Sequence, residues 1–125
     1  MFEKLEITRM AQALAAHDGA RMSILARNMA NADTPGYKAR DLPDFATVYS
    51  DAPLAMRSSR IGHLFAAAGS VAVPDIVKGA EAPNGNSVSL EAEMVKAVET
   101  RQSHEMAMAI YRATSDVVRA SLGRK

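Results

Sequence analysis

The chain of 125 residues contains no cysteine and no tryptophan, and only 3 phenylalanines and 3 tyrosines. The absence of cysteine excludes disulfides, thiolate catalysis and cysteine metal sites. The apolar fraction of 48% consists mostly of small or flexible residues, with alanine the commonest residue and 8 methionines. Such a composition favours helices packed closely along their lengths over one thick globular core.

The sequence also lacks an excess of charge and a long apolar run. Its 15 basic and 14 acidic residues give a formal net charge of +1, so no surface for phosphate backbones is evident and no nucleic-acid partner is expected. The longest uncharged run, IGHLFAAAGSVAVP, falls short of the roughly 20 apolar residues that span a bilayer. Glu3 and Glu6 stand where a secretory signal would be basic. We therefore expect neither a membrane span nor a cleaved signal peptide.

Groups with catalytic chemistry are equally scarce. The stretch HEMAM begins the zinc-peptidase pattern H-E-x-x-H at His104 but has Met108 in place of the second ligand. No motif joins His17 or His63 to it, and a lone helical histidine is usually a polar face residue. The sequence contains no phosphate-binding loop, nucleophile elbow or dinucleotide fingerprint. It therefore predicts no enzyme, no catalytic residue, no cofactor, no metal site and no small-molecule substrate.

What the sequence does contain is helical periodicity at both ends. In the first region, apolar residues recur at spacings of four and three, the signature of one stripe on a helix. This stripe consists of Ile7, Ala11, Leu14, Asp18, Met22, Leu25, Met29 and Ala32. It predicts a helix from about Phe2 to Ala32, with a bend or a local polar contact where Asp18 meets Gly19.

The second helix follows a turn signal at Asn84-Gly85 and takes Ser89 as its N-cap. Its stripe consists of Val95, Val98, Gln102, Met106, Ala109, Ala113, Val117 and Ala120, widened by Met94, Ile110, Val118 and Leu122. The helix is about 50 Å long at 1.5 Å per residue. We expect the stripe to pack against the N-terminal helix or a neighbouring subunit, with Thr114 on the side that faces water.

Between the helices, from about Leu42 to Ser87, the chain holds all but one of its 5 prolines and no sustained periodicity. A short run, SVAVPDIV, could form a strand. The predicted fold is therefore mainly α, with long terminal helices paired as an antiparallel hairpin or coiled coil and an irregular or partly β middle segment. The expected divisions are 1–33, 34–87 and 88–125. Such a hairpin leaves its widened apolar stripes partly exposed to solvent, so further copies or other helices are expected to cover them.

One segment, NMANADTPGYKARDLPDF from Asn28 to Phe45, has a distinctive sequence although few of its side chains could take part in a reaction. Thr34 precedes Pro35, which pushes its backbone out of the α region. Pro35-Gly36 has the fixed φ and the tolerance of positive φ that a type II turn needs. A helix-stop and turn account for this part, but not for the asparagines before it or the charged run after it.

These residues suggest a family. The stretch LARNMANADTPGYKARDLPDF resembles the N-terminal signature of bacterial flagellar rod, hook and hook-filament junction proteins, a helix carrying A-N-N-x-A-N followed by an N/D-T-P-G-Y turn. At the other end, NGNSVSLEAEM is similar to the family's G-N-x-V-x-[LM]-x-x-E segment and is followed by its closing helix. Pro43 stands where the family usually runs straight from D-[LI] to D-F, and the middle zone matches only faintly through LAMRSSRIGHL.

The resemblance implies a non-enzymatic subunit of the flagellar basal-body rod, and specifically of its proximal part. Its partners would be other copies of itself, other flagellar rod proteins and the proteins at the junction of rod base and export gate. In the family the terminal helices pack as a hairpin, and neighbouring hairpins form a tube around an export channel. Members leave the cell through the flagellar type III apparatus without a cleaved signal.

The resemblance also implies a role for the segment from Asn28 to Phe45. Asparagine side chains at the end of a packed helix can bond to backbone groups of neighbouring helices, tyrosine offers a flat apolar face with a polar tip, and charged residues can form ion pairs between subunits. The expected interface and motif residues are Asn28, Asn31, Asp33, Thr34, Pro35, Gly36, Tyr37, Lys38, Arg40, Asp41, Met106, Ala113 and Val117.

The residues leave an alternative function open. A helical adaptor or export-chaperone-like protein would use the same hairpin to bind one partner stoichiometrically. It would form a closed, monodisperse dimer with ordered ends, whereas a rod subunit would polymerise or adhere to other rod proteins. An enzyme of unknown class would require an ordered polar cleft with a bound metal or cofactor.

Overall fold

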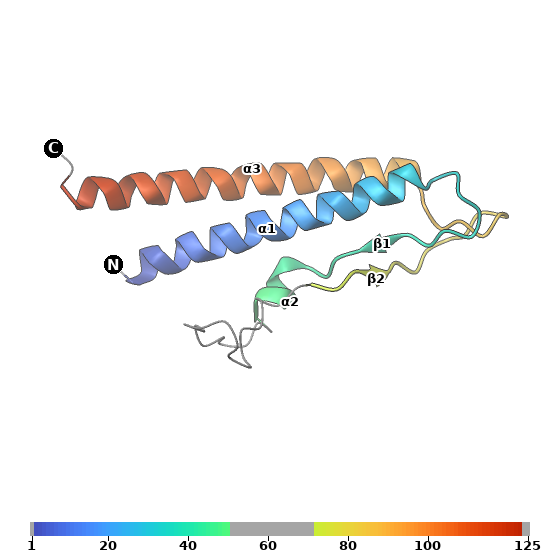
Figure 1. Ribbon diagram of the computed structural model, residues 1–125, viewed down its shortest axis with the longest axis horizontal. Helices are drawn as coiled ribbons and strands as arrows, with labels where there is room; N and C mark the ends of the chain where they lie inside the picture. Colours follow the sequence, from blue (N-terminus) through green and yellow to red (C-terminus); the bar gives the residue numbers. More distant parts are fainter. Residues whose placement is uncertain (1, 51–71, 124–125) are drawn as a thin grey trace, which may run out of the picture.

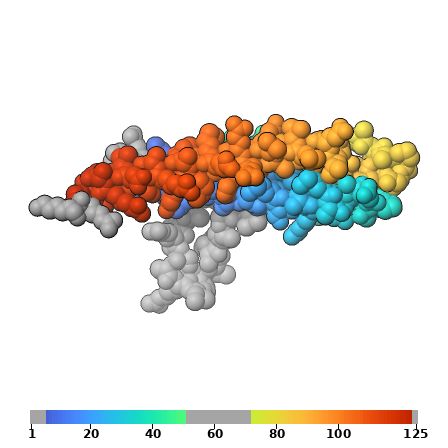
Figure 2. All heavy atoms as spheres, turned by 90° about the horizontal axis from the view of Figure 1, so that it is seen from above, coloured from blue at the N-terminus to red at the C-terminus, as the bar shows by residue number. Residues whose placement is uncertain are grey.

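Two long helices dominate the computed structural model, which describes residues 2–50 and 72–123 (Figure 1). Helix α1 spans Phe2–Ala30 and helix α3 spans Leu90–Ser121. They lie side by side and run antiparallel, so that the start of α1 and the end of α3 are at the same end of an elongated molecule (Figures 1 and 2). The prediction of a mainly α fold with paired terminal helices is confirmed.

The ends of the helices follow their local sequence. The hydroxyl of Ser89 accepts a hydrogen bond from the Ala92 N–H at 3.4 Å, which confirms it as the N-cap of α3. Glu91 and Glu93 place negative charge in the first turn of α3, and Arg119 lies in its last turn, as the helix dipole favours. Helix α1 ends two residues before the expected position.

The turn after α1 has the predicted form. Gly36 has a φ of 72°, and the Tyr37 N–H donates to the Thr34 carbonyl at 3.3 Å, closing a four-residue turn with Pro35 and Gly36 at its centre. The Gly36 N–H donates to the Asn84 carbonyl at 3.0 Å. The turn that ends α1 is therefore tied to the turn that precedes α3.

A short antiparallel ribbon runs back along α1 (Figure 1). Strand β1 (Arg40–Asp41) pairs with β2 (Asp75–Ile76), with Arg40 opposite Ile76. Bonds from the Val77 N–H to the Ala39 carbonyl and from the Ser87 N–H to the Tyr37 carbonyl continue the contact toward the turns. Of the run SVAVPDIV only Asp75–Ile76 is strand, and its first two residues lie outside the described part, as do His63 and the stretch LAMRSSRIGHL.

The chain after β1 takes a defined path despite Pro43. Leu42 is buried, the Pro43 carbonyl lies 2.9 Å from Nε2 of His17, and helix α2 (Phe45–Ser50) follows. The Phe45 ring meets the His17 ring edge-on at 5.7 Å. These contacts hold the start of α2 against the middle of α1.

The core is small and half polar. Among the described residues, the buried apolar ones are Ala11, Leu25, Ala39, Leu42 and Ala107. The buried polar ones are Asp18, Asn28, Asn86, Glu93 and Thr100. So small an apolar core supplies little hydrophobic stabilisation, and specific hydrogen bonds must define how the two helices fit together.

The face of α3 that meets α1 is not the stripe expected from the sequence. Its buried residues are Glu93, Thr100 and Ala107, about 150° around the helix from the centre of the expected stripe at 3.6 residues per turn. Val98 is 68% exposed and Met106 is 55% exposed. Of the two expected partners of the stripe, the structure excludes the N-terminal helix, and contact with a neighbouring subunit becomes a proposal.

Thr114 also lies on a different side of α3 from the one expected. Thr114 is half-buried on the flank of the face that meets α1, and its hydroxyl donates to the Ile110 carbonyl at 2.8 Å, whereas Ala113 is exposed. The expectation was wrong because it ranked faces by their apolar content, while small and polar residues built the contact. On α1 the expected stripe does face inward at Ala11, Asp18 and Leu25.

No helix within the described ranges 2–50 and 72–123 is long and apolar enough to cross a membrane.

We expect Gly36→Val to lower the free energy of unfolding by about 1–2 kcal/mol, because a β-branched side chain is strongly disfavoured at positive φ. Thermal unfolding followed by circular dichroism measures the change. Gly79→Val is the matched control, since its φ lies outside the left-handed region and an added Cβ there meets nothing within 4 Å. Equal melting temperatures for the two variants would contradict the assigned turn.

Candidate functional site

The side chain of Asn28 lies at the point where α1, β1 and α3 meet. It is fully buried. Its Nδ2 donates to the Arg40 carbonyl at 2.7 Å and to Oε2 of Glu93 at 2.8 Å. Its Oδ1 accepts from the Arg40 N–H at 3.2 Å and from the Tyr37 hydroxyl at 3.4 Å. Asn28 therefore bonds to groups of its own chain and offers no surface to another subunit.

A chain of alternating charges extends from this amide across the three elements. Oε1 of Glu93 lies 2.9 Å from Nζ of Lys96, and that nitrogen lies 3.8 Å from Oδ2 of Asp41. Arg21 on α1 donates to both carboxylate oxygens of Asp41, at 2.7 and 2.8 Å. Two carboxylates and two cations balance each other, and the bidentate Arg21 pair is the strongest geometry of this kind.

Burial and hydrogen bonding act in opposite directions on Asp41. Burial raises the pKa of its carboxyl. Hydrogen bonds from Arg21 and from the Leu42 N–H, together with the charges of Arg21 and Lys96, lower the pKa by more than burial raises it, so that it lies below its ordinary value. The hydrogen bond to Asp41 likewise raises the pKa of Arg21, against the effect of burial. Each group stabilises the charged form of the other.

Asn86 holds the turn that follows α1. This buried residue donates from Nδ2 to the carbonyls of Asn31, Ala32 and Thr34, at 3.0, 2.7 and 2.9 Å, and its Oδ1 accepts from the Val88 N–H at 2.7 Å. These three carbonyls lie beyond Ala30, the last residue of α1. Asn86 therefore joins the turn after α1 to the segment just before α3.

The structure separates the remaining motif residues into two groups. Asp33, Thr34, Pro35 and Gly36 are exposed and form the turn itself. Asn31 bonds locally, its Nδ2 donating to the Arg27 carbonyl at 2.8 Å. The motif residues brought together around the ribbon are Tyr37, Lys38, Arg40 and Asp41.

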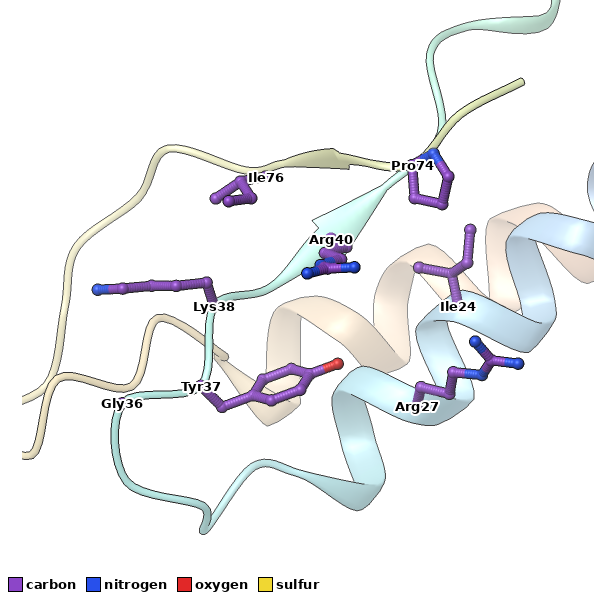
Figure 3. A pocket seen from close by; sticks show the side chains of 8 residues that line it. All are labelled: Ile24, Arg27, Gly36, Tyr37, Lys38, Arg40, Pro74 and Ile76. Atoms are coloured by element: carbon purple, nitrogen blue, oxygen red, sulfur yellow. The ribbon is translucent and has the colours of Figure 1, made fainter. Parts of the chain in front are cut away.

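A hollow of about 480 Å³ opens between α1 and the ribbon (Figure 3). Its cationic lining residues are Arg27, Lys38 and Arg40, and its other lining residues are Ile24, Gly36, Tyr37, Pro74 and Ile76. Lys38 pairs with Glu81 and donates to the Gly85 carbonyl. The hollow is therefore a basic surface with apolar walls, beside the end of α1.

Each of the two histidines in the described ranges contacts a backbone carbonyl of another segment, His17 that of Pro43 and His104 that of Ala15. Nδ1 of His104 lies 3.1 Å from the Ala15 carbonyl. Nδ1 of His17 lies 3.8 Å from Oδ1 of Asp18, beyond hydrogen-bond distance, and neither Nδ1 of His17 nor Oδ2 of Asp18 has a hydrogen-bond partner among the described residues. Within the part of the chain that the structure describes, no group of three His, Cys, Asp or Glu residues could hold a metal ion.

The outer face of α3 leaves large apolar side chains exposed, among them Val95, Val98, Met106 and Val117. No other described segment lies over α3 in the view of Figure 2. We call this surface the outer α3 stripe; it consists of Val95, Val98, Gln102, Met106, Ala109, Ala113, Val117 and Ala120, all exposed. The expected interface residues Met106, Ala113 and Val117 lie on it, far in sequence from the turn motif.

Sequence reasoning missed several residues that hold this arrangement. No local pattern marks Arg21 or Lys96, whose pairs with Asp41 join distant segments. Asn86 stands in the G-N-x-V-x-[LM]-x-x-E segment, but that pattern does not show its contacts with the turn after α1. The NGN stretch at Asn84 signalled a turn but not the role of its second asparagine. Glu93 stands in the first turn of α3, where the helix dipole favours a negative charge, and its carboxylate also accepts from the buried amide of Asn28.

Residues 10–38 match the model of a family described as flagella basal body rod protein. The matched segment covers most of α1 and the turn that follows it, including Asn28. No curated protein matches the chain. The match supports the class of flagellar basal-body rod components, which are structural rather than enzymatic. It likewise supports a location in the basal body and assembly with other rod components.

We expect Asn28→Ala to lower the free energy of unfolding by about 3 kcal/mol, because the Glu93 carboxylate and the Arg40 backbone lose buried partners. Asn31→Ala removes the same side chain from a half-exposed position with two local bonds, to the Arg27 carbonyl and from the Thr34 hydroxyl, and should cost less than about 1 kcal/mol. Urea unfolding measures both values. Equal losses would show that the two asparagines have equivalent roles.

The lowered pKa of Asp41 predicts weaker folding in acid. Because the folded carboxylate binds its proton less readily than the unfolded one, its contribution is fully present above the ordinary value of 3.8 and is lost as pH falls through the lowered folded pKa. The free energy of unfolding should therefore decrease below about pH 4. In Asp41→Asn this decrease should be smaller than in Asp33→Asn, a control at an exposed position; identical pH profiles would contradict the role of the Arg21 pair.

Proposed function

We propose that the chain is a non-enzymatic structural subunit of the flagellar rod in its proximal part. It packs by its helices into the drive shaft that transmits torque from the motor to the hook and encloses the export channel. The form NADTPGYKARD followed by Asp-Phe resembles the motif of FlgB, the proximal rod protein, which supports this position. We further propose export without a cleaved signal peptide by the flagellar type III apparatus.

The observation that carries the proposal is the reversed orientation of α3. Polar and small residues face α1, and the apolar stripe faces outward. An exposed apolar surface along the whole length of a helix is unfavourable in a protein that functions alone. It is favourable in a subunit whose neighbours cover it, and the stripe is long enough for a neighbouring helix to follow.

The motif segment has a supporting role in this proposal. Asn28, Asp41 and Asn86 hold the hairpin in one geometry from within, and so fix the direction in which the outer α3 stripe points. Met106, Ala113 and Val117 then contact neighbouring copies, other rod proteins or the proteins at the rod base and export gate. Tyr37, Lys38 and Arg40 add a polar and basic surface at the other end of the hairpin.

The test is Ala113→Glu, introduced into the gene in cells that build flagella with this chain. A charge at this exposed position leaves the hairpin intact, so the melting temperature of the purified chain should be unchanged. Covering that charge in an assembly costs several kcal/mol, so rods should be missing and motility lost. Electron microscopy of isolated basal bodies, with the chain identified by mass spectrometry, gives the readout.

Two variants control this test. Arg112→Ala changes the net charge by the same amount at an exposed position about 100° away, and should leave rods and motility intact. Thr114→Glu lies on the flank of the seam with α1 and should lower the melting temperature. Normal motility of Ala113→Glu, or a monodisperse dimer with the chain absent from basal bodies, would refute the rod function and favour a closed adaptor.

A further inference from the structure

We propose that copies of this chain pack head to tail, the outer α3 stripe of one copy against the outward face of α1 in the next. This inference rests on the proposed function and specifies which surfaces meet. The outward face of α1 consists of Gln12, Ala16, Gly19, Ala20, Ser23, Ala26 and Ala30. All of these except half-buried Gly19 are exposed.

The outer α3 stripe repeats every 11 residues. Val95, Met106 and Val117 are 11 apart, as are Val98, Ala109 and Ala120. Eleven residues in three turns is 3.67 residues per turn, close to the 3.6 of a straight helix. The stripe therefore runs almost along the helix axis, and a partner helix can follow it over its whole length with little supercoiling.

The outward face of α1 has the complementary relief. From Ala16 to Ala30 the side chains of this face are no larger than serine, apart from exposed Arg27, and a Cβ added at Gly19 meets nothing within 4 Å. Small residues let the backbone of a second helix approach closely. The valine and methionine side chains of the outer α3 stripe would fill the space above this flat face, whereas a second flat face would leave that space empty.

The exposed charges favour a contact between α3 of one copy and α1 of another. Arg9 and Arg27 are exposed on α1, and the structure gives neither side chain an ion-pair partner among the described residues. Glu91 and Glu99 are exposed beside the outer α3 stripe, also without ion-pair partners in the described part of the chain. Contact between α3 and α1 places these opposite charges on one interface, which favours this pairing.

The two faces lie on opposite sides of the hairpin, because each points away from the seam between α1 and α3. An interface made from two different faces is heterologous, and it continues from copy to copy into a ring or a helix. The hollow with Arg27 and Arg40 on its lining lies at the edge of the α1 face. It would add positive charge beside the acidic residues of the neighbouring α3 that packs on this face.

A photo-crosslinking amino acid at Met106 of the full chain tests this pairing in isolated basal bodies and in the concentrated purified chain. Illumination should give a band with the mass of two chains. Mass spectrometry should place the attachment within residues 10–30 of the second copy. The same amino acid at Arg112, beside the stripe, should give at least tenfold less of this product.

The other outcomes separate the inference from the proposed function. Attachment to α3 of a second copy, attachment only to a different rod protein, or equal yields from the two positions would overturn the head-to-tail pairing. The rod function would stand in each of these cases if the chain is present in the basal bodies. Absence of the chain from basal bodies would refute the rod function, and failure of the purified chain to crosslink through α1 would then refute the pairing as well.

Discussion

The structure depends on a single buried amide. Asn28 donates from one nitrogen to the ribbon backbone and to the Glu93 carboxylate, and it accepts from the Arg40 N–H through its oxygen. It thereby fixes α1, β1 and α3 relative to one another. An apolar side chain could fill the same volume but would leave a carboxylate and backbone groups without partners, which costs more than the packing would gain.

Because the helices are fixed by polar contacts, the apolar residues of α3 are not needed in the seam. Glu93, Thr100 and Ala107 suit a close approach between two helices, and the larger valines and methionines are left for the opposite face. The monomer thus exposes the surface that would normally form its core. This distribution is consistent with a chain whose stability comes partly from its neighbours in an assembly.

The turn motif and the outer α3 stripe are connected through this geometry, although they lie at different places in the molecule. Asn86 holds the turn after α1, the two turns bond to each other through Gly36 and Asn84, and the Arg21–Asp41–Lys96–Glu93 charges fix the rotation of α3. A change in the motif would therefore alter the direction in which the stripe points. The segment from Asn28 to Asp41 holds the hairpin together from within the subunit, and the outer α3 stripe lies elsewhere on the molecule.

The sequence by itself determined the elements. The two helices, the cap at Ser89 and the turn at Gly36 follow from local rules, since each depends on residues within a few positions of one another. The signature around Asn28 also indicated the family class that the match over residues 10–38 supports. The inward face of α1 was predicted correctly because its apolar stripe and its buried face coincide at Ala11 and Leu25.

Only the tertiary structure decided which face of α3 turns inward. The choice depends on contacts between groups 65 residues apart, such as Asn28 and Glu93, and on an ion pair between Arg21 and Asp41 across 20 residues. The periodicity of α3 shows where its apolar side chains lie, but it cannot show whether the chain itself or a neighbour covers them. The buried hydrogen bonds outweighed the apolar stripe, because an unpaired buried charge is costlier than an exposed valine.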